Sequence, residues 1–130
     1  MPFMSGIVKA FAHYGAVQRN SQWAVSAPIE GAIVMSLWEK KFKKGMRYED
    51  HLSRWSGPGN SLFREHLQQA IDEDLPIRLV MAYSSNPEGV DRGENASQFK
   101  NRFAVRPELV GKVVHFDGDE FHIQFERAKA

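Results

Sequence analysis

The sequence contains no cysteine. This absence excludes disulfide bonds, a thiol nucleophile and any zinc site built on Cys ligands. The chain also has no apolar run near the roughly 18 residues that a membrane-spanning helix requires, and residues 1–5 lack the charged and apolar regions of a secretory signal peptide. We therefore expect a cytoplasmic protein, of bacterial type, without a membrane partner.

The chain also has almost no excess of positive or negative charge. The 17 basic side chains nearly balance the 16 acidic ones and leave a net charge of +1, so the charge of the whole chain favours no class of partner. One basic cluster stands out beside Trp38 and Phe42, and it consists of Lys40, Lys41, Lys43, Lys44 and Arg47. It predicts either a surface that neutralises nucleic-acid phosphates or the solvated rim of a loop.

The chain is long enough and apolar enough for one folded domain. It has 130 residues, of which 42% are hydrophobic and 12% aromatic, a composition typical of a protein with a packed core. It shows no internal repeat and no low-complexity tract. We expect a single domain over residues 1–130.

A tight turn followed by an amphipathic helix is the clearest local pattern. Proline presets the backbone of Gly57-Pro58-Gly59, the two glycines permit positive φ angles, and Asn60 is then a natural N-cap. The apolar residues behind the turn share one helical face, and they are Leu62, Phe63, Leu67, Ala70 and Ile71. Because Pro76 disfavours helical geometry at the residue before it, the pattern predicts a helix over residues 60–74.

Two apolar runs predict buried strands. Residues 32–38 are apolar on both faces, and residues 77–84 form a nearly continuous apolar run after the helix. Weaker patterns indicate a strand over residues 22–27, a short strand that starts within 99–105, a connection or helical turn over 106–111, and polar loops over 39–47 and 84–97. Residues 1–12 fit either a strand or a helix.

The C-terminal residues predict a β-hairpin. Two alternating segments, residues 112–116 and 121–125, flank the turn formers of residues 117–120. The pattern fits either a two-residue or a four-residue loop. Both registers place the same five apolar side chains on the buried face, namely Val114, Phe116, Phe121, Ile123 and Phe125. His115 and His122 share the opposite face. The whole pattern predicts an α+β fold, with a mostly antiparallel sheet, one main helix packed on it and a C-terminal hairpin.

Candidate catalytic and metal-binding groups are few. His115 and His122 face each other across the predicted hairpin as two zinc or nickel ligands would, but no third ligand has a fixed spacing. Residues 39–41, Glu-Lys-Lys, resemble an element of restriction-type nucleases that also needs a second carboxylate, and Glu30 lies at the far end of the strand. No serine-hydrolase or phosphate-binding motif is present. We therefore predict no cofactor and no bound metal. A metal-dependent nuclease or hydrolase remains a hypothesis, ranked third behind the two that are given below.

Six aromatic side chains stand at expected strand ends or beside turns, where a ring lines a cavity while its polar edge stays hydrated. They are Trp23, Trp38, Trp55, Tyr14, Tyr48 and Tyr83. Trp23 and Trp38 are also consistent with ordinary core residues. Trp55 differs because Arg54 and the Gly-Pro-Gly turn flank it, a setting that favours a ring stacked on a ligand or a partner.

The residues from Arg54 to Asn60 read Arg-Trp-Ser-Gly-Pro-Gly-Asn, and the predicted helix and a strand over residues 78–85 follow them. This arrangement resembles the N-terminal DNA-reading domain of McrA-type modification-dependent restriction endonucleases, in which a Trp-Gly-Pro-Gly turn precedes a helix and a strand. Ser56 is inserted here relative to that turn. The resemblance covers about residues 50–125 and implies recognition of methylated or hydroxymethylated cytosine. A separate HNH domain cuts DNA in that family, and this sequence lacks the HNH motif.

The resemblance implies a pocket that stacks an extruded base between aromatic side chains. The candidate ligand contacts are Trp55, Tyr83, Asn60 and Trp23, with Trp55 and Tyr83 as stacking walls. The candidate phosphate contacts are Lys40, Lys41, Lys43, Lys44, Arg92, Lys100 and Arg102. The first hypothesis is thus a DNA-binding module that reads modified cytosine without a nuclease domain. The second is a small interaction or inhibitor protein of a mobile element or defence system, which predicts an exposed apolar patch and a protein partner.

Overall fold

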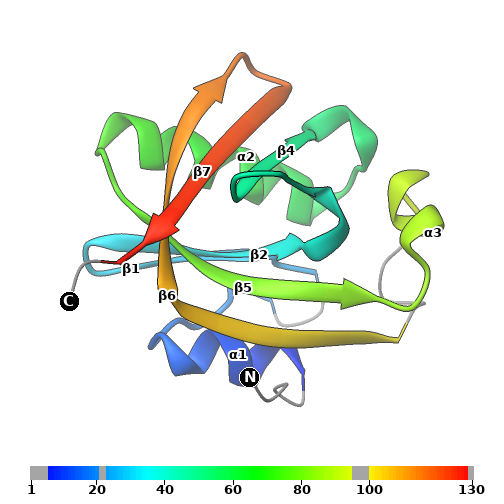
Figure 1. The fold of residues 1–130 in the computed structure, drawn as a ribbon, viewed down its shortest axis with the longest axis horizontal. Helices are drawn as coiled ribbons and strands as arrows, with labels where there is room; N and C mark the ends of the chain where they lie inside the picture. The colour runs from blue at the N-terminus through cyan, green and yellow to red at the C-terminus, as the bar shows by residue number, and fades with distance from the viewer. Residues whose placement is uncertain (1–5, 21–22, 95–99, 129–130) are drawn as a thin grey trace.

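The chain folds around a strongly bent sheet, seven-stranded in the part of the chain that is described (Figure 1). The computed structural model describes residues 6–20, 23–94 and 100–128. The strand order is β1-β2-β5-β6-β7-β4-β3. The strands are β1 (Ser26–Ile29), β2 (Ala32–Trp38), β3 (Phe42–Lys43), β4 (Arg47–His51), β5 (Ile77–Ser84), β6 (Asn101–Phe116) and β7 (Glu120–Arg127). The helices are α1 (Ile7–His13), α2 (Pro58–Asp72) and α3 (Pro87–Asp91), and the short 3-10 turns are η1 (Glu39–Lys41) and η2 (Leu52–Arg54).

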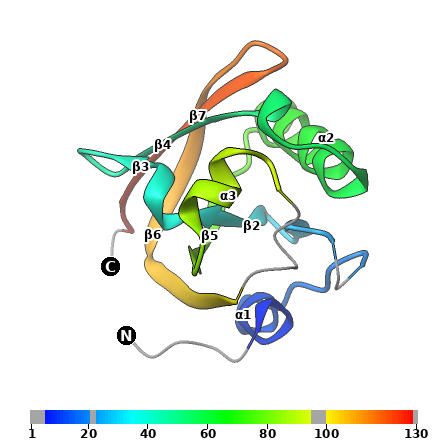
Figure 2. The same ribbon diagram turned by 90° about the vertical axis from the view of Figure 1, so that its right-hand side faces the viewer.

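The predicted α+β class is confirmed. Within the described sheet every pair of neighbouring strands is antiparallel except β2 and β5, which run parallel and are connected through β3, β4 and α2. The main helix, α2, packs on one side of β2 and β5, and α1 packs on the other side (Figure 2). None of the described helices combines the length and apolarity needed to cross a membrane.

Two hydrophobic cores explain why β2 and β5 are apolar on both faces. Successive side chains of a strand point to opposite faces of the sheet. Ile33 and Leu79 accordingly pack against α2 and the C-terminal hairpin, whereas Val34 and Val80 pack against α1. The predicted strands over 32–38 and 77–84 are therefore confirmed, with the bounds of β2 and β5.

The main helix differs from its prediction at both ends. It begins at Pro58, so Gly57 is the N-cap with a φ of 108° and Asn60 is not, because Asn60 already lies within the first turn. It ends at Asp72, and Asp74 then adopts a φ of 51° as the chain turns toward β5. Four of the five predicted apolar residues are buried, but Ile71 is 41% exposed because its side chain lies at the edge of the packed face.

The prediction of a connection or helical turn over residues 106–111 was wrong. These residues lie inside β6, a single strand of 16 residues that bends as it passes from β5 to β7 (Figure 1). Between Arg78 and Val80 the register with β5 shifts, so one residue of β5 faces the four residues 106–109 of β6. This irregularity accommodates Pro107, which cannot donate a ladder hydrogen bond.

The C-terminal hairpin forms with the four-residue loop, because Phe116 pairs with Phe121. His115 pairs with His122 on the opposite face, as predicted. The prediction that Val114 is buried was wrong. A bulge between Val113 and His115 leaves Val114 without a partner in β7, and its side chain is 48% exposed.

Several short elements lie where the sequence patterns were weak. The ambiguous N-terminal segment contains α1, the predicted loop over 39–47 contains η1 and β3, and the predicted loop over 84–97 contains α3. The predicted strand over 22–27 is displaced, since β1 starts only at Ser26. Phe99, which was expected near the start of a strand, lies outside the described residues.

Candidate functional site

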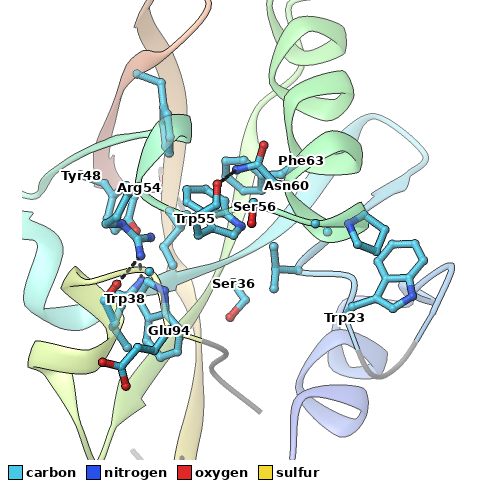
Figure 3. Close-up of a pocket in the computed structure, with 18 residues that line it drawn as sticks. Trp23, Ser36, Trp38, Tyr48, Arg54, Trp55, Ser56, Asn60, Phe63 and Glu94 are labelled. Atoms are coloured by element: carbon cyan, nitrogen blue, oxygen red, sulfur yellow. Dashed lines mark hydrogen bonds between the residues drawn. The ribbon is translucent and has the colours of Figure 1, made fainter. Parts of the chain in front are cut away.

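A cavity of about 470 Å³ opens between the N-terminal turn of α2, the end of β2 and α3 (Figure 3). Aromatic and other apolar side chains dominate its walls, which include Trp23, Val25, Leu37, Trp38, Tyr48, Trp55, Pro58, Phe63, Val90 and Phe121. The polar and charged side chains at the cavity are Ser36, Arg54, Ser56, Asn60 and Glu94. Small-molecule sites in proteins commonly have volumes of about 300–1,000 Å³ and this mixture of apolar walls with a few polar groups.

All three tryptophans of the chain line this cavity. Trp23 precedes β1, Trp38 is the last residue of β2, and Trp55 lies between η2 and α2. Each of the three is partly rather than fully buried. Segments that are separate in the sequence therefore contribute indole rings to one concave surface.

Trp55 is held by its neighbours on two sides. The guanidinium carbon of Arg54 lies 4.7 Å from the centre of its ring, and Phe63 of α2 makes an edge contact with ring centres 5.8 Å apart. The Nδ2 atom of Asn60 donates hydrogen bonds to the carbonyl oxygens of Leu52, at 2.8 Å, and Trp55, at 3.0 Å. Asn60 thus ties the turn before α2 to its first helical turn, in place of the N-cap role that was predicted.

Arg54 joins three parts of the site through one guanidinium group. Its Nε and Nη2 atoms donate to the two carboxylate oxygens of Asp50 at 2.8 and 2.7 Å, and its Nη1 atom donates to the carbonyl oxygen of Val90 at 2.7 Å. The side chains of Arg54 and Asp50 are only 6% and 1% exposed. Burial by itself would lower the pKa of Arg54, but the hydrogen bonds and negative charge of Asp50 raise it, so the group stays charged.

Tyr48 extends this network beneath the cavity. Its hydroxyl donates to Asp50 at 3.1 Å and accepts from the backbone N–H of Trp38 at 3.4 Å. Burial, reinforced by the negative charge of Asp50, raises the pKa of Tyr48 well above its usual value of 10.0. The phenol is therefore neutral at physiological pH and acts as a fixed hydrogen-bonding group between β2 and β4.

The wall formed by α3 is fastened at several points. Lys41 of η1 makes an ion pair with Asp91 at 2.7 Å, and the hydrogen bond of Lys41 lowers the pKa of Asp91. Gly93 has a φ of 75°, and a Cβ atom at this position would lie 2.0 Å from the carbonyl oxygen of Arg54. Only glycine permits this close approach, so the backbone after α3 closes directly over Arg54.

The charges at the cavity are compensated within the protein. Arg54 is neutralised by Asp50, and Glu94 at the rim pairs with Arg92 at 2.6 Å. Ser36, Ser56 and Asn60 are the uncharged polar side chains at the cavity. The site therefore offers flat aromatic surfaces and a few hydrogen-bonding groups without an unpaired charge at its centre.

The structure brings three of the four predicted ligand contacts together. Trp55, Asn60 and Trp23 line the cavity, whereas Tyr83 does not. The hydroxyl of Tyr83 accepts a hydrogen bond from Arg106 at 2.8 Å, farther along the sheet. Tyr83 and Trp55 consequently do not form opposing walls of one pocket, because Tyr83 lies beside Met81 and Arg106 near the end of β5.

The sequence patterns did not single out Arg54 and Asp50 as a pair. A usable signal was present, since the two residues stand four positions apart. That spacing normally joins side chains on one helix. Here Asp50 lies in β4 and Arg54 ends η2, so only the turn between these elements brings the carboxylate and the guanidinium together.

The predicted phosphate contacts fall into two groups. Lys41 and Arg92 are already engaged with Asp91 and Glu94. The remaining side chains are exposed on η1, on the β3–β4 turn and at the start of β6, and they are Lys40, Lys43, Lys44, Lys100 and Arg102. An external anion would have to displace Asp91 from Lys41 and Glu94 from Arg92.

Two histidines were considered as metal ligands. His115 and His122 lie with ring centres 4.8 Å apart, but the described residues contain no group of three His, Asp or Glu side chains placed to hold a metal ion. Ser26 and His66 form a pair at 2.6 Å between Oγ and Nδ1. Because Ser26 is only 1% exposed, no substrate reaches its hydroxyl, and the pair links β1 to α2.

Comparisons of the chain with protein-family models, with curated proteins and with solved structures each return no match.

Proposed function

We propose that this protein binds DNA and reads a modified cytosine by holding the extruded base in the cavity lined by Trp23, Trp38 and Trp55. The observation that carries the proposal is the convergence of all three tryptophans on one concave surface. Proteins that act on or read a single base within a duplex extrude it and stack it between aromatic or apolar side chains. Each stacked base contributes about 1–3 kcal/mol of binding free energy.

The charges favour a neutral planar ligand over a cationic one. A cage of aromatic rings also suits quaternary ammonium groups, which bind over the electron-rich face of an indole. At Trp55 the guanidinium group of Arg54 already lies over the ring at 4.7 Å. Arg54 therefore already occupies the position over this ring that a cationic ligand would take, whereas a neutral base needs only the aromatic surface that Arg54 leaves uncovered.

The polar groups at the cavity suit the edges of a cytosine. A carboxylate is the side chain that accepts from the exocyclic amine of cytosine, and Glu94 stands at the rim. Ser36 and Ser56 offer hydroxyl groups that both donate and accept. The apolar walls are suited to a methyl group on the base, since they bury it without leaving a polar atom unpaired.

The test compares matched DNA duplexes by fluorescence anisotropy. The duplexes carry cytosine, methylcytosine or hydroxymethylcytosine at one position and are otherwise identical. We expect the wild-type protein to bind a modified duplex more tightly than the unmodified one. Trp55→Ala should weaken binding to the modified duplex about 5- to 150-fold, the equivalent of one lost stacking contact.

Tyr83→Ala is the matched control, because Tyr83 is also a partly buried aromatic residue but does not line the cavity. It should leave the preference for the modified duplex intact. Equal affinity for all duplexes would reduce the protein to a binder of the DNA backbone. No binding to any duplex would overturn the proposal and turn attention to a protein partner.

A further inference from the structure

We infer that the cavity has two stacking positions and reads a dinucleotide unit, with the extruded base at Trp38 and Trp55 and an adjoining base at Trp23. This inference rests on the proposed function. It names a longer ligand than a single base and gives Trp23 a role of its own.

The volume of the cavity is the first argument. A cytosine base has about eight non-hydrogen atoms, and at no more than about 30 Å³ for each, the share of a water molecule in the liquid, it fills about 240 Å³. The cavity measures about 470 Å³. One base therefore occupies about half of this volume and leaves room for a second base.

The arrangement of the rings is the second argument. Figure 3 shows Trp38 and Arg54 at one end of the cavity and Trp23 at the other, with Trp55, Ser36 and Ser56 between them. Two separate aromatic surfaces suit two bases better than they suit one.

The ring of Trp23 has no aromatic or cationic partner among the described residues, in contrast to Trp55, which has Arg54 and Phe63. A partly buried indole that faces a cavity without such a partner is an open surface for stacking. Trp23 thus provides what a second base requires.

The backbone of Trp23 is nevertheless firmly placed. The N-terminal turn of α2 packs so closely against it that a Cβ atom on Gly59 would lie 2.4 Å from the carbonyl oxygen of Trp23. Gln18 donates to the carbonyl oxygen of Ala24 at 2.6 Å, and the N–H of Ser36 donates to that of Val25 at 2.8 Å. These contacts involve the backbone of residues 23–25, so loss of the indole ring should leave the backbone in place.

The experiment measures affinity by isothermal titration calorimetry with short synthetic probes. The probes are 5-methyl-2′-deoxycytidine, dinucleotides with a second base on its 5′ or its 3′ side, and the same dinucleotides with an abasic sugar in place of the second base. The abasic probes separate stacking from phosphate contacts. We expect one dinucleotide to bind about 5- to 150-fold more tightly than its abasic counterpart.

In Trp23→Ala the difference in affinity between the dinucleotide and its abasic counterpart should disappear. Trp23→Leu, which keeps an apolar side chain but no ring, should behave in the same way, and circular dichroism should show both variants folded. Trp55→Ala should instead weaken the binding of every probe.

Equal affinities for the dinucleotides and their abasic counterparts would overturn the inference and leave a single-base pocket. The same conclusion would follow if Trp23→Ala weakened both kinds of probe equally. If neither the probes nor a modified duplex bound at all, the proposed function itself would fail, and the two failures are thereby distinguished.

Discussion

Arg54 is the residue on which the geometry of the cavity most depends. Its guanidinium group contacts a carboxylate of β4, a backbone carbonyl of α3 and the ring of Trp55. Arginine suits this position because its planar fork donates several hydrogen bonds in fixed directions, which the single ammonium group of lysine does not. A buried pair of this kind is costly to separate, since one charge would remain buried without its partner.

Arg54→Leu should therefore lower the free energy of unfolding by about 3–5 kcal/mol, because it leaves Asp50 buried without its partner. Chemical denaturation followed by tryptophan fluorescence measures this change. The double variant Asp50→Leu, Arg54→Leu is the control. It should be more stable than Arg54→Leu alone, since no unpaired charge remains. A loss below about 1 kcal/mol in the single variant would show that the pair behaves like an exposed one.

At the scale of the elements, α2 connects the cavity to the edge of the sheet. Its first two turns line the cavity with Asn60 and Phe63. One turn farther on, His66 meets Ser26 at the start of β1. His66 is 7% exposed, and burial lowers its pKa from the usual value of 6.5 despite the opposing negative charge of Glu65. The neutral imidazole is the form that the folded protein prefers.

This preference predicts a pH dependence of stability. The folded pKa of His66 is lowered, so the unfolded chain binds more protons, and the contribution of the neutral imidazole is present above about pH 6.5 and lost as the pH falls through the folded pKa. Denaturation series between pH 7.5 and 5 measure the change. His66→Gln should show a smaller fall in stability than the wild type. Equal falls in the wild type and in His66→Gln would contradict the prediction.

At the scale of the whole molecule, electrostatics act locally because the net charge is only +1. The exposed cations of the predicted phosphate group lie on η1, on the β3–β4 turn and at the start of β6. Figure 2 shows the β3–β4 turn projecting from the body of the molecule. Lys43 and Lys44 on this turn are exposed. If the protein binds DNA as proposed, they are accessible to a duplex that extends beyond the cavity.

Replacement of Lys43 and Lys44 by Gln should weaken the salt dependence of duplex binding. Each phosphate contact contributes about 0.9 to the slope of log K against log salt concentration, so the slope should fall by about 1.8 if each lysine holds one phosphate. Anisotropy titrations at several salt concentrations measure it. Lys112→Gln, on the other half of β6, should leave the slope unchanged. An unchanged slope in the variant that lacks Lys43 and Lys44 would show that the β3–β4 turn does not contact the DNA.

The elements that could be predicted from the sequence are those whose signals come from residues close together in the chain. The helix after Gly57 and the strands β2 and β5 were predictable because their signals lie within a few neighbouring residues. The continuity of β6 could not be predicted, because a strand that contains Pro107 forms only where a bulge in its pairing with β5 accommodates the proline. Val114 was misplaced for the same kind of reason, since a bulge depends on both strands.

At the candidate site, the sequence by itself determined the setting of Trp55, because the Gly-Pro-Gly turn and the start of α2 adjoin it in the chain. It also determined the class of the fold, through the spacing of apolar residues along each segment. Only the tertiary structure decided that Trp23 and Trp38 meet Trp55 at one cavity, that Tyr83 lies elsewhere, and that Asp50 neutralises Arg54. The physical reason is that backbone preferences act over a few residues, whereas the meeting of distant side chains depends on which strands pair and how helices pack on them.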